Sequence, residues 1–126
     1  MRIITDHIVE GDSINHQIEI TVTDEPGQGG ANHKYEIRKP HGHGADFPLL
    51  CSVNFQNGPI KEVGVNGITQ EALIAICMDR LRSFQKGPFA CDDNQIALDH
   101  LRLALRTLQN RTRARIARGV EGTNTK

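Results

Sequence analysis

The sequence predicts an α+β protein in which an antiparallel β-sheet is followed by a C-terminal antiparallel hairpin of two helices. Two observations support this order. In the first half of the chain, short runs alternate apolar with polar residues, which is the period of half-buried strands. After Gly67 the apolar residues recur every three or four positions, as they do on one face of an amphipathic helix. The chain therefore changes from sheet to helices near its middle.

Three runs in the first half are expected to be strands: "HQIEITVTD", "HKYEIRK" and "FPLLCSVNFQ". The segments between them, "DEPGQGGAN" and "HGHGAD", are rich in Gly or Pro and are expected to be loops. The next segment, "NGPIKEVGVNG", has an Asn-Gly pair at each end and is expected to form a hairpin at the edge of the sheet. Successive hairpin connections imply that the strands pair antiparallel.

Two helices are expected in the second half. Thr69 is a suitable N-cap for a first helix of about residues 70–85. A second cap is expected at Asp92 or Asp93, and the helix that follows runs to Gly119, a residue type that often ends helices. Because the link "KGPFACDD" is short, the two helices are expected to lie antiparallel.

The length of 126 residues predicts a single domain. Within it we expect the sheet and its loops over about residues 1–66, the helical hairpin over 67–119 and a tail at 120–126. Three cysteines without C-x-x-C spacing signal neither a disulfide framework nor a zinc site. No apolar run has the length of a signal peptide core or a membrane span. We therefore expect a soluble intracellular protein with no membrane partner.

The formal net charge is zero, but acidic residues prevail in the first 25 positions and arginines in the last 25. Arg111, Arg115 and Arg118 stand at i, i+4 and i+7 and so share one helix face. They either compensate the negative end of the helix dipole or bind an anion together with donors of the following tail. The tail residues concerned are Gly119, Val120, Gly122 and Thr123.

The remaining motifs do not indicate catalysis. "GQGGANH" lacks the GxGxxG spacing and the Walker lysine, so it is either a flexible loop or a loop that contacts a ligand. His33, His41 and His43 are close in sequence, but no acidic or cysteine arrangement completes a metal site around them. Neither a nucleophile elbow nor HExxH is present. We expect no catalytic residue, no metal and no cofactor.

Two further residues have both a structural and a binding interpretation. Phe84 ends the apolar face of the first helix, where it either completes the core or stacks on a nucleotide base. Asn94, in the first turn of the second helix, either caps that helix locally or presents its amide to a ligand.

The chain resembles the phage-encoded Thoeris anti-defence sponges of the first type in three segments, taken in order. These segments are "GGANHKYEI", "FQNGPIKEVGVNGITQEALIAICMDRLRSFQKGPFA" and "ALDHLRLALRTLQNRTRARIARGVEGT". The helical hairpin also resembles the related anti-CBASS sponges. The resemblance covers most of the chain from Gly30 to Thr123.

The resemblance implies a non-enzymatic binder that acts in the cytoplasm of an infected bacterium. Members of this family capture cyclic ADP-ribose isomers, and some also bind cyclic di- or trinucleotides at separate sites. By holding the messenger they keep a defence effector inactive. Matched to the family, Phe84 would stack on the base, Asn94 would contact the base or ribose, and Arg111 would bind the pyrophosphate.

Two loops, "GANH" and "FQNGPI", would close over the ligand if the chain follows the family. Their implied contact residues are Ala31, Asn32, His33, Asn57 and Ile60. A basic contact that the family would provide is not obvious between Asn57 and Ile60.

Asn94 and Arg111 are 17 positions apart on one expected helix, which corresponds to about 25 Å. No small cyclic nucleotide spans this distance. If Asn94 and Arg111 line one pocket, Arg111 must come from a second protomer packed antiparallel. The family interpretation therefore predicts a homodimer or a higher assembly such as a hexamer.

Two rival functions follow from the residues. A hydrolase of such a messenger would need a base, for which the candidates are His33, His41, His43 and His100. A nucleic-acid-binding module would use the arginine-rich helix, but the net charge of zero and the few aromatic residues argue against a nucleic acid polymer as partner.

Overall fold

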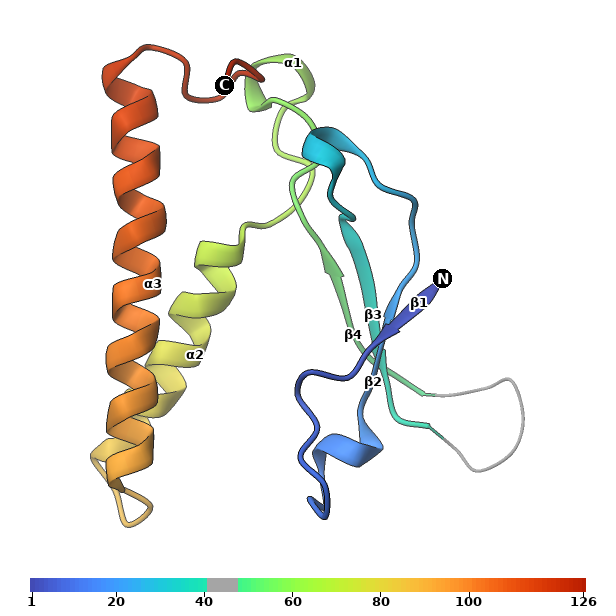
Figure 1. Cartoon of the computed structure of the whole chain (residues 1–126), viewed down its shortest axis with the longest axis vertical. Helices are drawn as coiled ribbons and strands as arrows, with labels where there is room; N and C mark the ends of the chain where they lie inside the picture. Colours follow the sequence, from blue (N-terminus) through green and yellow to red (C-terminus); the bar gives the residue numbers. More distant parts are fainter. Residues whose placement is uncertain (41–47) are drawn as a thin grey trace. The chain divides into compact units, whose positions relative to one another are not determined.

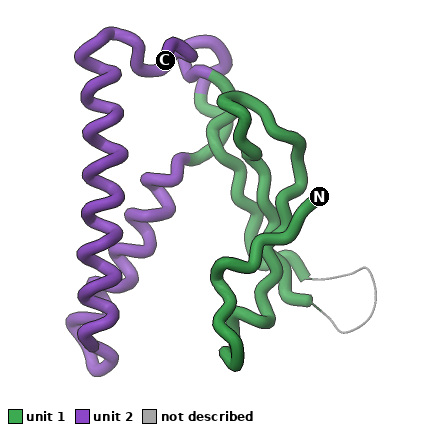
Figure 2. The backbone as a smooth tube through the Cα atoms, viewed as in Figure 1, with its two compact units in different colours: residues 1–58, 65–68 green, residues 59–64, 69–126 purple. Residues whose placement is uncertain are grey.

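The computed structural model describes residues 1–40 and 48–126, which form two compact units. Unit 1 comprises residues 1–58 and 65–68, and unit 2 comprises residues 59–64 and 69–126 (Figure 2). Unit 1 holds the sheet, and unit 2 holds the helices. The chain order of sheet first and helices second confirms the predicted α+β class (Figure 1).

Unit 1 is built on a four-stranded antiparallel sheet in the order β1-β2-β3-β4. The strands are β1 (Arg2–Ile4), β2 (Glu19–Val22), β3 (Lys34–Arg38) and β4 (Leu49–Asn54). Two short 3-10 helices, η1 (Asn15–Gln17) and η2 (Gln28–Gly30), lie in the loops before and after β2. The three strands predicted from alternation correspond to β2, β3 and β4.

The register separates the sheet into an apolar and a polar face. Val22 pairs with Tyr35, and Tyr35 pairs with Val53, so the three side chains lie on the same face. Val22 is 1% and Val53 9% exposed, and they form the core of this unit. The ring of Tyr35 also meets that of Phe55 edge to face, with centroids 5.6 Å apart. The alternation in the sequence thus reports which face is buried.

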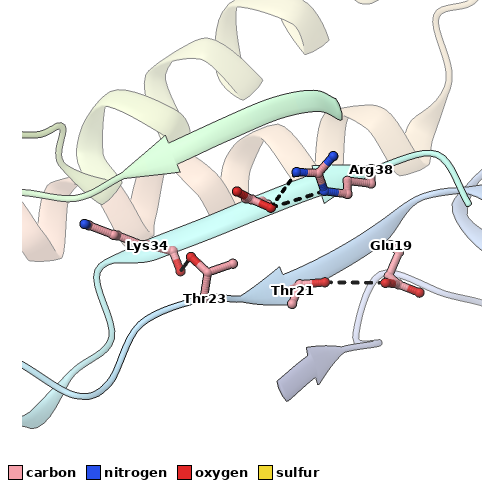
Figure 3. A network of polar contacts seen from close by, with 6 residues as sticks. Glu19, Thr21, Thr23, Lys34 and Arg38 are labelled. Carbon is pink, nitrogen blue, oxygen red and sulfur yellow. Dashed lines mark hydrogen bonds and ion pairs between the residues drawn. The ribbon is translucent and has the colours of Figure 1, made fainter. Parts of the chain in front are cut away.

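The opposite face of the sheet carries polar side chains (Figure 3). On β3, Arg38 donates to Glu36 Oε2 from Nε at 3.1 Å and from Nη2 at 2.8 Å. On the neighbouring β2, the Thr21 hydroxyl lies 3.4 Å from the Glu19 carboxylate. Because both side chains of the Arg38–Glu36 pair are about one-third exposed, this pair contributes little stability.

The predicted hairpin between Asn57 and Gly67 is wrong. The run inside it is a single helical turn, α1 (Ile60–Val63), which begins after Pro59. Pro59 is the N-cap residue of this turn with φ of −67°, a value that proline fixes, and this outweighs the turn preference of the Asn-Gly pairs. Past α1, Ile68 returns to Phe55 and forms an isolated parallel bridge with it.

Unit 2 contains α2 (Gln70–Gln85) and α3 (Asp92–Ala117), which pack against each other as an antiparallel hairpin (Figure 1). The Thr69 hydroxyl accepts a hydrogen bond from the Ala72 N–H at 3.1 Å, so the predicted cap of α2 is confirmed. Gly119 follows the end of α3 with φ of +73°, as expected of a terminating glycine.

The predicted cap of α3 at Asp92 or Asp93 is wrong. Cys91 is the N-cap residue, with an extended φ of −156° and no capping bond from its side chain. Both aspartates lie in the first turn instead, where their charge complements the positive end of the helix dipole.

The core between the two helices is small. Met78 on α2 is 5% and Leu98 on α3 is 2% exposed. Other large apolar side chains on these helices remain open to solvent, including Ile76 at 64% and Leu103 at 61%. No helix within residues 1–40 and 48–126 combines the length and the hydropathy needed to cross a membrane.

Candidate ligand-binding site

The link between α2 and α3 brings two of the predicted site residues together. The rings of Phe84 and Phe89 meet edge to face, with centroids 6.4 Å apart and an angle of 88° between their planes. The Asn94 side-chain amide donates to the carbonyl oxygen of Phe89 at 3.3 Å. Phe84 and Asn94 are therefore joined through Phe89, and both remain partly accessible. The arrangement offers an aromatic ring and an amide at one place.

A clasp formed by Gln85 holds this link in shape. Its Nε2 donates to the Cys91 carbonyl oxygen at 3.1 Å, and its Oε1 accepts from the Cys91 N–H at 3.0 Å. The N–H of the N-cap residue thus finds a partner outside its own helix. The clasp fixes the end of α2 relative to the start of α3.

Arg80 is a residue at this location that the sequence patterns did not single out. Its guanidinium carbon lies 4.9 Å from the centroid of the Phe84 ring. The two residues stand at i and i+4 on α2, a spacing that places side chains side by side on a helix. That spacing was visible in the sequence and is the signal that would have identified Arg80.

The tail after α3 is organised by Arg115. Its guanidinium donates to three main-chain carbonyl oxygens: from Nη1 to Thr125 at 2.7 Å, and from Nη2 to Val120 at 3.0 Å and Thr123 at 3.1 Å. The Thr123 hydroxyl also donates to the Val120 carbonyl oxygen. The Arg115 guanidinium thus makes three hydrogen bonds within the chain, and the tail folds around this side chain.

Gly122 and α1 lie close together in unit 2. The Lys61 N–H donates to the Gly122 carbonyl oxygen at 3.1 Å. A Cβ atom on Gly122 would lie 2.9 Å from Ile60 Cγ2 and 3.3 Å from Lys61 Cγ. Only glycine therefore fits here, and Lys61 brings a cation beside the tail. This cation directly follows the Asn57–Ile60 segment, in which the sequence provides no basic residue.

The other arginines of α3 are arranged differently. Arg111 is exposed, and in the described part of the chain no hydrogen bond or ion pair involves its guanidinium. Arg113 donates to the Asn110 side chain at 2.9 Å, and Arg118 donates to the Lys126 carbonyl oxygen. Asn94 and Arg111 do lie on one continuous helix, 17 positions apart.

In unit 1, the carboxylate of Asp24 anchors the loop that precedes β3. It accepts from the His33 N–H at 3.0 Å and the Lys34 N–H at 3.1 Å. Desolvation alone would raise the pKa of Asp24, but these backbone hydrogen bonds outweigh it and hold the pKa below its ordinary value of 3.8. Asn32 donates to the Asp24 carbonyl oxygen at 2.7 Å, and Ala31 accepts from the Gly27 N–H at 2.8 Å.

His33 is the buried member of this loop, with 7% of its surface exposed. Its Nδ1 atom is buried without a partner in the described structure. A Cβ atom on Gly27 would lie 3.3 Å from this nitrogen and 3.1 Å from Asn57 Oδ1, so His33 and Asn57 both border Gly27. Asn57 is held in place by Asn66, which accepts from its N–H at 2.8 Å.

Of the histidines considered as metal ligands and bases, only His33 and His100 lie within the described residues. His41 and His43 lie outside the described residues. Among residues 1–40 and 48–126, no group of three His, Cys, Asp or Glu side chains is arranged to hold a metal ion.

Comparison with known proteins matches half of the chain, from within β4 to the last turns of α3, to a family. The family model described as "Acb2/Tad1, hairpin domain" matches residues 51–113, which include the Phe84–Asn94 link. The chain is also 43% identical over 101 residues to "Thoeris anti-defense 1" of Bacillus phage SBSphiJ7. The chain belongs to the Acb2/Tad1 family.

The alignment with the phage relative covers 79% of this chain and 66% of the relative. Membership of the Acb2/Tad1 family confirms the resemblance seen in the sequence. The matched segment also contains Arg80, Asn94 and Arg111, whereas Arg115 and the tail lie beyond it.

Proposed function

We propose that this protein is a non-enzymatic sponge that sequesters cyclic nucleotide messengers of bacterial anti-phage immunity, in the cytoplasm of the infected host. The messengers are cyclic ADP-ribose isomers, with cyclic di- or trinucleotides as further ligands. The observation that carries the proposal is that Phe84 and Asn94 both contact Phe89, the first through its ring and the second through its carbonyl oxygen, inside the segment that matches the Acb2/Tad1 family.

The chemistry of this location suits a nucleotide. A base stacks on an aromatic ring with a gain of about 1–3 kcal/mol, whichever base it is. An amide distinguishes donor from acceptor groups on the edge of the base or on the ribose. The phosphates require a cation, and Arg111 is an exposed arginine that no carboxylate occupies in the described structure.

Arg111 reaches the same ligand only from a second protomer. It stands 17 positions from Asn94 on α3, or about 25 Å along the helix. An antiparallel symmetric pair of helices brings each Arg111 to the other protomer's Phe84 and makes two equal sites. We therefore propose a homodimer or a higher assembly, of which a hexamer is one form.

Exposed apolar side chains support self-association. Ile96 and Leu103 are one heptad apart on α3, at 52% and 61% exposed, and Ile76 on α2 is 64% exposed. Burying such side chains at about 25 cal/mol per Å² favours association. A second copy of this chain is the partner that also completes the proposed site.

A second ligand site is proposed at the tail, with Arg118, Gly119, Gly122 and Thr123 as its contacts. In the structure the Gly119 N–H donates to the Ile116 carbonyl oxygen and the Thr123 hydroxyl to that of Val120, so these donors would exchange partners when a ligand binds. Arg115 and Val120 shape this segment through the hydrogen bond between them. Loop contacts to the cyclic ADP-ribose isomer are proposed for Ala31, Asn32, His33, Asn57 and Ile60.

One experiment separates a sponge from its rivals. The purified chain is incubated with cyclic ADP-ribose isomers, free ligand is measured, and the protein is then heat-denatured and the released ligand is analysed by mass. A sponge depletes the ligand and returns it intact. Release of an altered product would instead establish a hydrolase.

The matched variants are Phe84→Ala, which should abolish depletion, and Phe89→Leu, which keeps an apolar residue at the link and should retain most of it. Binding to long oligonucleotides that weakens steeply with salt, without depletion of any cyclic nucleotide, would establish the nucleic-acid-binding alternative.

A further inference from the structure

The geometry at the end of α2 points to a second arginine in the ligand site: we propose that Arg80 binds a phosphate of the nucleotide whose base stacks on Phe84. This inference rests on the proposed function and adds to it a contact from the same protomer. It concerns a side chain to which neither the sequence patterns nor the family resemblance gave a role.

The first argument is the position of the guanidinium. Its central carbon is 4.9 Å from the centroid of the Phe84 ring, within the range of a cation–π contact. The planar guanidinium stacks on an aromatic ring with its five N–H groups at the edge, so the contact restricts the side chain without using its donors. The contact therefore favours a position of the Arg80 side chain over the ring before a ligand arrives.

The second argument is the absence of a competing partner. In the described part of the chain, the ion pairs are Arg38–Glu36 and Arg102–Asp99, and no carboxylate or carbonyl oxygen accepts a hydrogen bond from Arg80. Arg115 contrasts with it, because three carbonyl oxygens of the tail accept from that guanidinium. Of these two arginines of unit 2, Arg80 is the one with free donors beside an aromatic ring.

The third argument is the fit to the ligand class. Because the Arg80 guanidinium lies over one face of the Phe84 ring, the base would stack on the other face, and its ribose and phosphates would pass the rim of the ring, within reach of the N–H groups at the edge of the guanidinium. A guanidinium fork matches two phosphate oxygens with two parallel hydrogen bonds. Arg80 thus supplies positive charge to the site within one protomer, whereas Arg111 requires the second one.

The test is isothermal titration of the wild-type protein, Arg80→Ala and Arg80→Gln against two probes: the cyclic ADP-ribose isomer that the wild type depletes, and adenosine, which has the base and ribose but no phosphate. Arg82→Ala is the matched control, since Arg82 is an exposed arginine on the same helix and contacts no aromatic ring among the described residues. Circular dichroism spectra verify that each variant keeps its helices.

We expect both Arg80 variants to lose about 10- to 100-fold in affinity for the cyclic ligand, as one charge-assisted bidentate contact predicts. Their affinity for adenosine should stay within about threefold of the wild type, and Arg82→Ala should bind both probes normally. Equal losses for both probes would mean that Arg80 only orients Phe84, and this would overturn the inference. So would an Arg80→Ala variant that binds like Arg82→Ala. A wild-type chain that depletes no messenger would overturn the proposed function itself.

Discussion

Gly67 lies directly against the main chain of Phe55: a Cβ atom at position 67 would be 2.4 Å from the Phe55 carbonyl carbon and 2.5 Å from its oxygen. The close approach is needed for the parallel bridge between Phe55 and Ile68, because any side chain at position 67 would push the two segments apart. Phe55 in turn carries the ring that meets Tyr35. The small size of Gly67 thus allows the segment that follows β4 to stay paired.

Replacing Gly67 by Ala should therefore destabilise unit 1 by about 1–3 kcal/mol, since neither backbone segment can yield without a shift. Tyr35 is the only tyrosine in a chain without tryptophan, so its fluorescence during urea unfolding reports on this unit. The matched control is Gly87→Ala, because the nearest atom to a Cβ there is 3.8 Å away. Equal unfolding midpoints for the two variants would contradict the importance of this contact.

Asp24 should make the stability of unit 1 depend on pH. Its pKa is lowered in the folded state, so its contribution is fully present above the ordinary value of 3.8 and is lost as the pH falls through the lower folded pKa. Asp24→Asn keeps an acceptor for the His33 and Lys34 N–H groups but removes the charge. We expect this variant to have a flatter dependence of unfolding free energy on pH below 3.8 than the wild type. Asp12→Asn serves as comparison, because backbone hydrogen bonds from Val9 and His16 also lower the pKa of Asp12 despite the opposing desolvation.

Arg115→Ala should loosen the tail while leaving the hairpin intact. The variant removes three donor contacts to carbonyl oxygens, and charge-assisted contacts of this kind contribute roughly 1–3 kcal/mol. Hydrogen exchange of the Thr123 amide, which donates to the Val120 carbonyl oxygen, should accelerate at least about tenfold. Arg113→Ala, which removes only a contact to Asn110, should leave that rate unchanged. Protection of Thr123 that survives in Arg115→Ala would show that the tail folds without this arginine.

Sites shared between protomers should be restored by mixing inactive chains. Phe84→Ala and Arg111→Ala should each abolish binding of the messenger, whereas Arg113→Ala should not. When the two inactive variants are co-expressed, half of the dimers are mixed and each mixed dimer has one complete site, so about a quarter of the wild-type capacity should return. Recovery of no capacity in a verified mixed dimer would refute the shared site.

Introducing a charge at the exposed apolar surface should separate the protomers. Leu103→Glu places a carboxylate at a position that is 61% exposed in the isolated chain and that association would bury. Light scattering should then report a lower mass than for the wild type. Gln109→Glu adds the same charge elsewhere on α3 and should keep the wild-type mass. A monomeric wild type would remove the basis of the shared site.

The longer elements, β2, β3, β4, α2 and α3, were predictable because the pattern of residues within each of them determines its secondary structure. Thr69 caps α2 as expected, and Gly119 ends α3. The structure of the segment around α1 was not predictable, because Pro59 favours a helical start while the Asn-Gly pairs on either side favour turns. The first strand, β1, has three residues, too few for a period to be recognised.

The candidate site was predictable in part. Phe84 and Asn94 are near in sequence across a short link, and the structure connects them through Phe89. Arg80 could have been found only by inspecting every pair of residues at i and i+4 on the predicted helix, and a helix contains many such pairs. The bonds that engage Arg115 depend on how the tail folds back, which no local pattern specifies.

The length of α3 determines how strongly charges at its two ends interact. Asn94 and Arg115 are 21 positions apart on this helix, about 32 Å, which is several times the distance of about 8 Å over which salt in the cell screens a charge. A phosphate bound near one end of α3 is therefore not felt at the other end of the same helix. Direct electrostatic coupling between the two ends of α3 is therefore weak within one protomer. In the proposed antiparallel dimer the second protomer's Arg111, four positions from its own Arg115, would lie at the first protomer's Asn94 end, so the two ends would influence each other across the interface.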